Sequence, residues 1–273
     1  MPAVFTDLDG SLHHAEAGFH PQDYDALIRL GKQGIPRTIV TGRSLYSARK
    51  VLTADFPIDY LIFSSGAGVF DWATQTLLQS NGFTDSEFQD AYDCLNHLQL
   101  DFMLHAAVPD NHRLWYQQYS QVNPDFEARL ALYQEFSIPF QKINPEKNYS
   151  QFLAVVPPES AEINYLRLLE ALSHLSIIRA TSPLDYQSGW LEVFPAHVSK
   201  SQSSAWLCSQ FGWQETMALG NDYNDLDLLH WADWGFATIY APDLLKQDFE
   251  LVNCPSQGGF SQAVDKWLTS LIS

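Results

Sequence analysis

The chain has 273 residues, which is enough for one large domain or two modest ones and for a sizeable buried core. A hydrophobic fraction of 46% with only 17% charged residues is typical of a compact globular protein and excludes a disordered one. The net charge of −17, without a cluster of Lys or Arg, argues against a nucleic-acid partner, because nothing would neutralise the phosphates.

In the first segment, short apolar stretches alternate with helical patterns. The first stretch closes at Gly10 and is typical of a buried strand that ends in a turn. Ser44 is placed to cap a later helix. The predicted elements are a strand at 3–7, a helix at 21–35, a strand at 36–42, a helix at 45–52 and a strand at 59–71. Strands that alternate with helices predict parallel pairing with right-handed crossovers.

From about residue 82 the pattern changes, which predicts a separate α+β unit inserted into the first. Its predicted elements are a helix at 86–98, strands at 102–108 and 151–156, a helix at 160–175, and strands at 176–181 and 190–195. Residues 109–148 are polar and aromatic with weak periodicity, and their pattern assigns no element.

The last segment returns to the style of the first. Its predicted elements are a helix at 199–212, a strand at 216–220, a turn and helix at 221–232, strands at 234–239 and 249–253, and a helix at 260–271. The sequence thus predicts an α/β fold. Residues 1–81 and 188–273 form a Rossmann-like, doubly wound parallel sheet, and residues 82–187 form the insert.

Cysteine usage and apolar run lengths indicate the compartment. Cys94, Cys208 and Cys254 are far apart, odd in number and outside any metal-ligand spacing, so no disulfide framework is expected. No charged and then apolar leader precedes the first strand, and no apolar run approaches membrane-spanning length. We expect a cytoplasmic protein without a membrane partner, as a monomer or a weak homodimer.

Two carboxylates, Asp7 and Asp9, stand two residues apart where the first strand ends. Alternation along a strand would point both side chains to the same face. Like charges held that close need a cation or a shared proton. A pair of this kind can also be a solvated turn, so the rest of the chain has to decide between the two interpretations.

Three further segments carry reactive residue types: Thr41-Gly42-Arg43, Lys200, and the stretch from Gly220 to Asp225. Strand ends in a parallel sheet meet in one crevice at its carboxyl edge, which would gather these segments around Asp7. Each also has a plainer explanation. Thr41 can serve a helix cap, Lys200 is one of 15 basic residues, and the acidic stretch can simply begin a helix.

In this order, the four segments resemble the four motifs of the haloacid dehalogenase-like superfamily of phosphohydrolases. "DLDGS" resembles its nucleophile motif, "VTGRS" its Thr/Ser motif, Lys200 its lysine, and "LGNDYNDLDLL" its acidic metal motif. The insert between "SSGAG" and "LEVFP" is similar to the α/β cap of the branch that holds the Cof-type and sucrose-phosphate phosphatases. The resemblance implies the fold of that superfamily, with the insert as a cap that sets substrate specificity.

The resemblance also implies a phosphatase that hydrolyses phosphoric monoesters with Mg²⁺ as cofactor. Asp7 would ligate the metal and attack phosphorus, which forms an aspartyl-phosphate. Asp9 would protonate the leaving alcohol and then activate water, while its carbonyl oxygen touches the metal. Thr41 and the Gly42 N–H would bind phosphate oxygens, and Lys200 would offset charge on both Asp7 and the phosphoryl group.

Two departures from the family pattern concern the metal and the substrate. Most relatives have Asp where this chain has Asn221, so either the amide oxygen ligates the metal or Asp222 takes over. We expect Asn221 and Asp222 to share the role of metal ligand, with Asp225 supporting them from outside the metal's immediate ligands. Substrate contacts are implied for Arg43, Ser65 and Gly66, although Cof-type relatives usually have Asn at the position of Ser65.

A small phosphorylated metabolite, most simply a sugar phosphate, is the expected substrate. "TGRSLYSAR" resembles the corresponding stretch of sucrose-phosphate phosphatases, and the insert is rich in side chains that suit hydroxyls. His105, Tyr149 and Gln151 are candidate contacts there. Two alternatives stay open: a phosphomutase-type phosphoryl transferase, and a non-catalytic sugar-phosphate-binding module. The second stays open because Asn221 replaces the Asp of most relatives.

Overall fold

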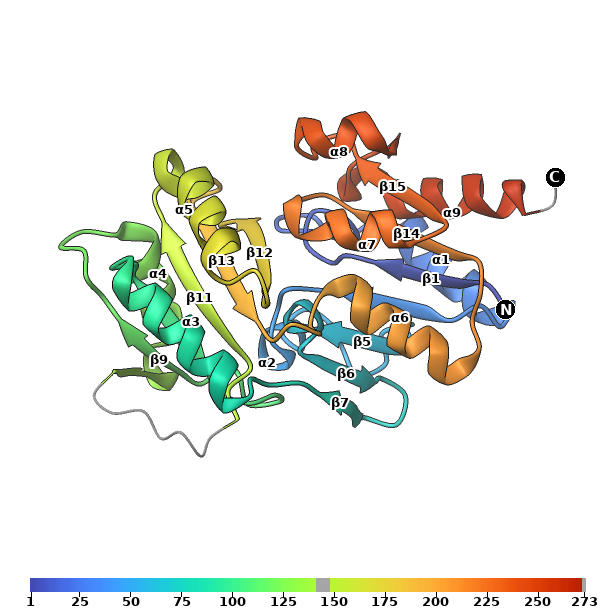
Figure 1. Ribbon diagram of the computed structural model, residues 1–273. Coiled ribbons are helices and arrows are strands. Elements are labelled where there is room, and N and C mark those ends of the chain that lie inside the picture. The colour runs from blue at the N-terminus through green and yellow to red at the C-terminus, as the bar shows by residue number, and fades with distance from the viewer. Residues whose placement is uncertain (141–147, 272–273) are drawn as a thin grey trace. The chain divides into compact units, whose positions relative to one another are not determined.

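A computed structural model describes residues 1–140 and 148–271, and the chain forms two compact units (Figure 1). The core unit comprises Met1–Arg43, Ala48–Gln79 and Lys200–Ser273, and the insert unit comprises Ser44–Ser47 and Ser80–Ser199. The sequence-based boundary after residue 187 falls just before β13 (Gly189–Phe194), a strand that pairs within the insert unit. The insert therefore continues to Ser199.

The core unit is built on a sheet that has eight strands among the described residues. In sheet order these are β16 (Glu250–Val252), β15 (Trp234–Thr238), β14 (Thr216–Gly220), β1 (Ala3–Thr6), β4 (Arg37–Val40), β5 (Tyr60–Phe63), β6 (Gly68–Asp71) and β7 (Thr76–Ser80). Neighbours from β16 to β5 pair in parallel. The central strands β1 and β14 are largely apolar and buried along their whole length, as strands covered on both faces must be. The predicted α/β class is confirmed.

Helices cover both faces of this sheet. They are α1 (Pro21–Lys32), α6 (Lys200–Phe211), α7 (Leu226–Trp231), α8 (Asp243–Asp248) and α9 (Gly259–Ser270), with short 3₁₀ turns at Ser64–Gly66, Tyr223–Asp225 and Pro255–Gln257. The short helix α2 (Leu45–Ala48) follows β4, and all of it but Ala48 belongs to the insert unit. α1 contacts α9 on one face, and α6 contacts α7 on the other (Figure 1). α1 begins at Pro21, whose fixed φ suits a first helical turn, and it buries Leu27 and Leu30. A small hairpin of β2 (His13–His14) and β3 (Gly18–Phe19) follows β1.

A strand forms within 59–71 and ends at small residues, as predicted, but the prediction missed that the chain then reverses and forms a second strand. β5 and β6 pair antiparallel around a turn at Ser64, Ser65 and Gly66. These three residues have φ values of 50°, 52° and 110°, in the left-handed region that only glycine adopts freely. The turn places small side chains and backbone N–H groups at the end of β5.

The insert unit has a six-stranded sheet within the described residues. In sheet order its strands are β10 (Ser137–Pro139), β9 (Leu114–Gln117), β8 (Phe102–His105), β11 (Gln151–Val156), β13 and β12 (Ser176–Thr181). Its helices are α3 (Asp85–His97), α4 (Pro124–Leu132) and α5 (Pro158–Ala171), with a 3₁₀ turn at Gln134–Phe136.

The two faces of the insert sheet carry different hydrophobic clusters. On one face, α3 and α5 pack on a cluster that includes Phe102, Phe152 and Val193. On the other, Phe126 of α4 packs with Met103, Leu153 and Trp190. Elements β9, α4 and β10 lie in the stretch to which the sequence pattern assigned nothing. None of the helices in the described part is both long and apolar enough to cross a membrane.

Candidate active site

The residues singled out in the sequence lie at one edge of the core sheet. Asp7, Thr41 and Asn221 directly follow β1, β4 and β14, which are neighbours in the order β14-β1-β4. Lys200 opens α6, and Ser64 follows β5. Because these strands run parallel, their carboxyl ends share an edge, and binding sites of open α/β sheets form there.

A buried cluster of three charged side chains forms the centre of this edge. Lys200 Nζ donates to Asp7 Oδ1 at 2.7 Å and also to Asp225 Oδ1. Lys200 and Asp225 are fully buried, and Asp7 is 5% exposed. Two carboxylates thus share one ammonium group, and this part of the site holds a surplus of negative charge when both are ionised.

The pKa values in this cluster reflect that surplus. Burial, together with the nearby Asp225 carboxylate, raises the pKa of Asp7 to about 8, although Lys200 opposes the rise. Burial alone would lower the pKa of Lys200, but the Asp225 and Asp7 carboxylates hold it above its ordinary value. Lys200 is therefore protonated at neutral pH, and Asp7 needs a second cation nearby to be fully ionised there.

Asp9 is held as a carboxylate by basic neighbours. Arg43 binds it with two hydrogen bonds, Nε to Oδ2 and Nη2 to Oδ1, both at 2.6 Å. His13 Nδ1 lies 3.6 Å from Asp9 Oδ1. Burial would raise the pKa of Asp9, but the nearby His13 and the hydrogen bonds from Arg43 lower it below its ordinary value. A proton-donor role for Asp9 therefore requires the bond to Arg43 to loosen first.

The side chain of Asn221 ends among oxygen atoms of the loop after β1. One of its amide atoms lies 2.8 Å from the Asp9 carbonyl oxygen, 3.2 Å from Asp7 Oδ2 and 3.1 Å from Ser11 Oγ. With nitrogen at that position the amide donates hydrogen bonds to these oxygens. With oxygen there, Asn221 presents an amide oxygen close to the Asp9 carbonyl oxygen and to Asp7 Oδ2, which are the kinds of ligand that Mg²⁺ prefers.

These oxygen donors fit Mg²⁺ in chemistry and in number. Carboxylate, carbonyl and amide oxygens are hard ligands, and Mg²⁺ ordinarily takes only a few from the protein. In residues 1–140 and 148–271, no three Asp, Glu, His or Cys side chains converge as metal ligands. A metal at this edge would therefore depend on the Asn221 amide and the Asp9 carbonyl oxygen as well as on Asp7.

Both side-chain oxygens of Asp225 accept hydrogen bonds from the protein. Its Oδ2 accepts hydrogen bonds from the backbone N–H of Asn221 at 2.8 Å and of Asp222 at 3.1 Å, and its Oδ1 accepts from Lys200. Gly220 permits this contact, since a Cβ there would lie 2.4 Å from Asp225 Cβ. Asp225 thus orients both Lys200 and the chain that carries Asn221.

The loop with Thr41 and Gly42, to which the resemblance assigned phosphate, is hydrogen-bonded to the loop with Ser65 and Gly66, to which it assigned other substrate contacts. Ser64 N–H donates to the Arg43 carbonyl at 2.8 Å, and Ser65 N–H donates to the Thr41 carbonyl at 3.0 Å. Thr41 is 1% exposed, and its Oγ1 accepts from Arg43 N–H at 3.1 Å, which leaves the hydroxyl proton to be donated. The left-handed backbone of Ser64 and Ser65 costs energy, as is common at functional sites.

Sequence reasoning missed several neighbours of the site. Ser11 Oγ reaches the Asn221 amide, and His13 reaches Asp9. His13 lies four residues after Asp9, and that short separation was the available signal. Gly42 lies near Asn224, because a Cβ on Gly42 would be 3.8 Å from Asn224 Nδ2. Asn224 is part of the quoted acidic motif, but nothing in its spacing points to Gly42.

The three candidate substrate contacts in the insert unit do not all lie together. His105 and Gln151 are directly opposite each other on β8 and β11. Tyr149 instead stacks on Phe88, with ring centroids 5.3 Å apart, in the cluster under α3 and α5. Tyr149 therefore packs in an apolar core and does not join the other two.

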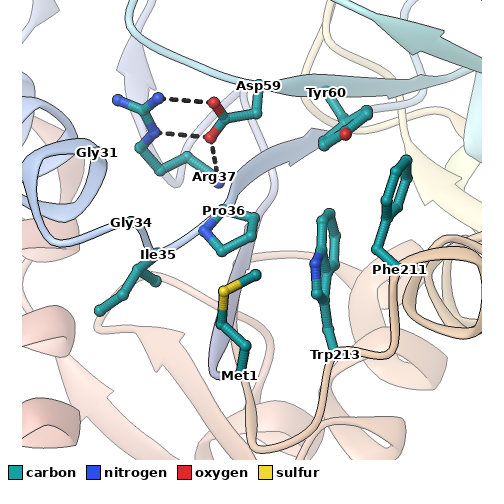
Figure 2. A pocket seen from close by; sticks show the side chains of 10 residues that line it. All are labelled: Met1, Gly31, Gly34, Ile35, Pro36, Arg37, Asp59, Tyr60, Phe211 and Trp213. Carbon is teal, nitrogen blue, oxygen red and sulfur yellow. Dashed lines mark hydrogen bonds and ion pairs between the residues drawn. The ribbon is translucent and has the colours of Figure 1, made fainter.

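A cavity of about 270 Å³ lies at the opposite, amino edge of the core sheet (Figure 2). It is lined by residues that precede or begin strands, among them Arg37, Asp59 and Trp213. Arg37 Nε and Nη2 each donate to Asp59 at 2.8 Å, and Nη1 donates to the Leu27 carbonyl at 3.0 Å. The charges there are balanced, and the cavity is lined by none of the candidate site residues named above.

Known proteins similar to this chain are phosphatases. The sequence matches the model of the haloacid dehalogenase-like hydrolases over residues 4–254. The Bacillus subtilis 5-amino-6-(5-phospho-D-ribitylamino)uracil phosphatase YwtE is 23% identical over 295 residues, with 98% of this chain and 99% of YwtE covered. The structure of BT1666 from Bacteroides thetaiotaomicron has a TM-score of 0.76 at 21% identity, with 98% of this chain and 95% of BT1666 covered. The subclass IIB sugar phosphatase BT4131 has a TM-score of 0.75 at 19% identity, with 98% and 99% covered.

Proposed function

Because the chain belongs to the haloacid dehalogenase-like hydrolases and is a phosphatase, we propose that it uses Mg²⁺ to hydrolyse a sugar phosphate through an aspartyl-phosphate. The observation that carries the proposal is the buried cluster of Asp7, Lys200 and Asp225, with the Asp9 and Asn221 oxygens beside it. Its surplus of negative charge is suited to a divalent cation, and a phosphate dianion could not approach a carboxylate nucleophile without one.

In the proposed mechanism, Asp7 Oδ2 attacks phosphorus while Lys200 holds Oδ1. The P–O bond to the alcohol breaks, and the leaving oxygen takes a proton from Asp9. Mg²⁺, held by Asp7, the Asp9 carbonyl and Asn221, would neutralise charge on the phosphate and favour the ionised form of Asp7. The Thr41 hydroxyl and the Gly42 N–H bind phosphate oxygens.

The second half of the reaction returns the enzyme to its starting state. Asp9 is then a carboxylate and removes a proton from water, which attacks the aspartyl-phosphate at phosphorus and releases inorganic phosphate. Arg43 can make its two bonds to Asp9 between the two half-reactions, while Asp9 is a carboxylate, and the cycle ends with Asp9 protonated and ready for the next substrate. Arg43 thus positions the proton carrier, and its bonds must loosen when Asp9 is protonated.

The assignment of the substrate class is supported by chemistry that the relatives share. YwtE is named for a phosphoribityl compound and BT4131 for a sugar phosphate, and both ligands are phosphate esters of hydroxyl-rich alcohols. Fold likeness does not determine a substrate, so the assignment needs its own experiment.

A screen of phosphorylated metabolites, read as released phosphate with and without Mg²⁺, tests the proposal. We expect turnover of sugar phosphates that stops after EDTA treatment and returns with Mg²⁺. Asp7→Asn should be inactive, while Asp243→Asn, which removes a carboxylate whose side chain is 90% exposed, should match the wild type. Full activity after exhaustive EDTA treatment would contradict the metal role. An isomeric sugar phosphate without released phosphate would indicate a mutase instead.

A further inference from the structure

The cavity at the amino edge of the core sheet is lined only by residues of the core unit (Figure 2). Its volume of about 270 Å³ is close to the lower limit for small-molecule pockets, about 300 Å³, and suits a molecule with a single ring. Phe211 is 48% exposed and Trp213 is 7% exposed, so Phe211 lies at the rim of the cavity and Trp213 lies deeper. The cavity is thus open to solvent beside Phe211.

One wall of the cavity consists of three aromatic rings. Trp213 stacks on Phe211, with ring centroids 5.2 Å apart and an angle of 19° between the planes, and the Tyr60 ring lies 5.4 Å from that of Trp213. Figure 2 shows Trp213 with Phe211 on one side and with Met1 and Pro36 on the other. The second face of Trp213 is therefore turned toward apolar side chains that also line the cavity, and a flat ring can stack on it.

The charged side chains of the cavity satisfy each other. Each guanidinium nitrogen of Arg37 already donates a hydrogen bond, two of them to Asp59 and one to the Leu27 carbonyl. Asp59 also accepts from the Arg37 backbone N–H at 2.8 Å. A bound anion would lie beside the Asp59 carboxylate, and a bound cation would lie beside the Arg37 guanidinium. The lining therefore favours an uncharged ligand, because either kind of ion would lose its hydration without gaining a free counter-charge.

The aromatic wall carries two polar groups that can donate to a ligand. Within residues 1–140 and 148–271, neither the Tyr60 hydroxyl nor the Trp213 indole nitrogen makes a hydrogen bond. Burial, together with the Asp71 and Asp59 carboxylates, raises the pKa of Tyr60, so its hydroxyl keeps its proton and can donate. The indole N–H of Trp213 can only donate. A ligand that offers an acceptor at the edge of its ring matches both groups.

We propose that this cavity binds an uncharged aromatic ring that carries a carbonyl group, as an aromatic amide or lactam does. The ring stacks on Trp213 and packs against Pro36 and Met1, and its carbonyl oxygen accepts from the Tyr60 hydroxyl and the Trp213 N–H. The site is independent of the proposed function, since none of the residues assigned to phosphate or Mg²⁺ lines it. A phosphate monoester, which is a dianion, does not belong to its ligands.

A series of small probes tests the chemistry of the ligand. Benzamide, benzoate and benzamidine have nearly the same shape and are neutral, anionic and cationic at pH 7, while cyclohexanecarboxamide keeps the amide and lacks the aromatic ring. Titrations of the whole chain by saturation-transfer NMR compare their binding. We expect benzamide to bind at least tenfold more tightly than each of the other three. If benzamide does not bind, or if benzoate or benzamidine binds as tightly, the inference is wrong.

Matched variants test the place of binding. Trp213→Leu removes the stacking face and should weaken benzamide binding at least tenfold. Tyr60→Phe keeps the ring but removes the hydroxyl, and it should weaken binding about fivefold. Trp234→Leu and Tyr240→Phe are the matched controls, because these side chains are 39% and 77% exposed and lie outside the cavity. Both controls should bind benzamide as the wild type does.

Further variants separate binding from folding and from catalysis. Trp213 belongs to a hydrophobic cluster of the core unit, so a melting temperature accompanies each titration. If Trp213→Leu does not fold, Phe211→Ala, which removes a half-exposed ring, and Tyr60→Phe decide the question, and unchanged binding in both would refute the inference. Asp7→Asn should bind benzamide normally, and a loss there would place the ligand at the other edge. Benzamide binding by a wild type without phosphatase activity would refute the proposed function alone.

Discussion

The charged side chains at the two edges of the core sheet are balanced in different ways. At the amino edge, Arg37 and Asp59 bind each other through two hydrogen bonds and balance one another (Figure 2). At the carboxyl edge, Lys200 is shared by Asp7 and Asp225, so two carboxylates face a single ammonium group. A balanced pair needs nothing further and connects two strands. An unbalanced cluster is costly unless another cation joins it, and this is the property expected of a site that binds a divalent cation.

The largest contrast between the edges is expected in catalysis. Asp7→Asn should lower kcat by at least about a thousandfold, because it removes the attacking charge and a metal ligand together. Asp59→Asn, the matched change at the other edge, should leave kcat within about twofold. Phosphate release from the best substrate measures both. Near-wild-type turnover by Asp7→Asn would show that Asp7 is not the nucleophile.

Replacement of the basic side chain at each edge should lower the free energy of unfolding by different amounts. Lys200→Met leaves two buried carboxylates without their partner and should cost about 3–5 kcal/mol. Arg37→Met should cost only about 1 kcal/mol, because the side chains of Arg37 and Asp59 are 14% and 35% exposed and water can replace the bond. Urea unfolding of both variants gives the comparison. Equal losses would mean that the carboxyl edge is not unusually charged.

A magnesium titration of activity sharpens the account of the carboxyl edge. Asn221→Ala should raise the Mg²⁺ concentration for half activity about tenfold, equivalent to about 1.4 kcal/mol of binding. Asn221→Asp should lower it, because a carboxylate binds Mg²⁺ more strongly than an amide does. Asp222→Ala should have the smaller effect. If Asp222→Ala gives the larger shift, Asp222 rather than Asn221 is the ligand.

The last prediction concerns a buried carboxylate that lies at neither edge. Asp23 on α1 accepts from Ser261 N–H at 2.7 Å, and burial raises its pKa from 3.8 to about 6. The folded state therefore binds this proton more readily than the unfolded state. The resulting stability is present below pH 4 and is lost as the pH rises through 6. Asp23→Asn should remove this slope and gain about 2 kcal/mol relative to the wild type between pH 4 and pH 7.5, as measured by urea unfolding. An unchanged slope would contradict the raised pKa.

Local sequence patterns predicted the part of the fold that positions the candidate site. β1, β4 and β14 are apolar or β-branched stretches that stop at reactive residues, and parallel strands bring such ends together. The turn after β5 was not foreseen, because Ser64 and Ser65 adopt left-handed backbone conformations that favour glycine. Their serine side chains gave no sign of a reversal, so one strand was predicted where a hairpin forms.

Contacts between distant side chains could not be read from the sequence. Arg43 binds Asp9 across 34 positions, and Asp225 accepts from both Lys200 and the loop it closes. Such contacts depend on strand order and on rotamers.

The central claim is that Asp7 carries the phosphoryl group during turnover. Mass spectrometry of an acid-quenched reaction tests it most directly, with Asp9→Asn used to slow the release of phosphate from the enzyme. The account predicts that the peptide containing Asp7 gains the mass of one phosphoryl group, that the gain disappears in Asp7→Asn, and that hydroxylamine removes it. Turnover without a label on Asp7, or a label on another residue, would contradict the account.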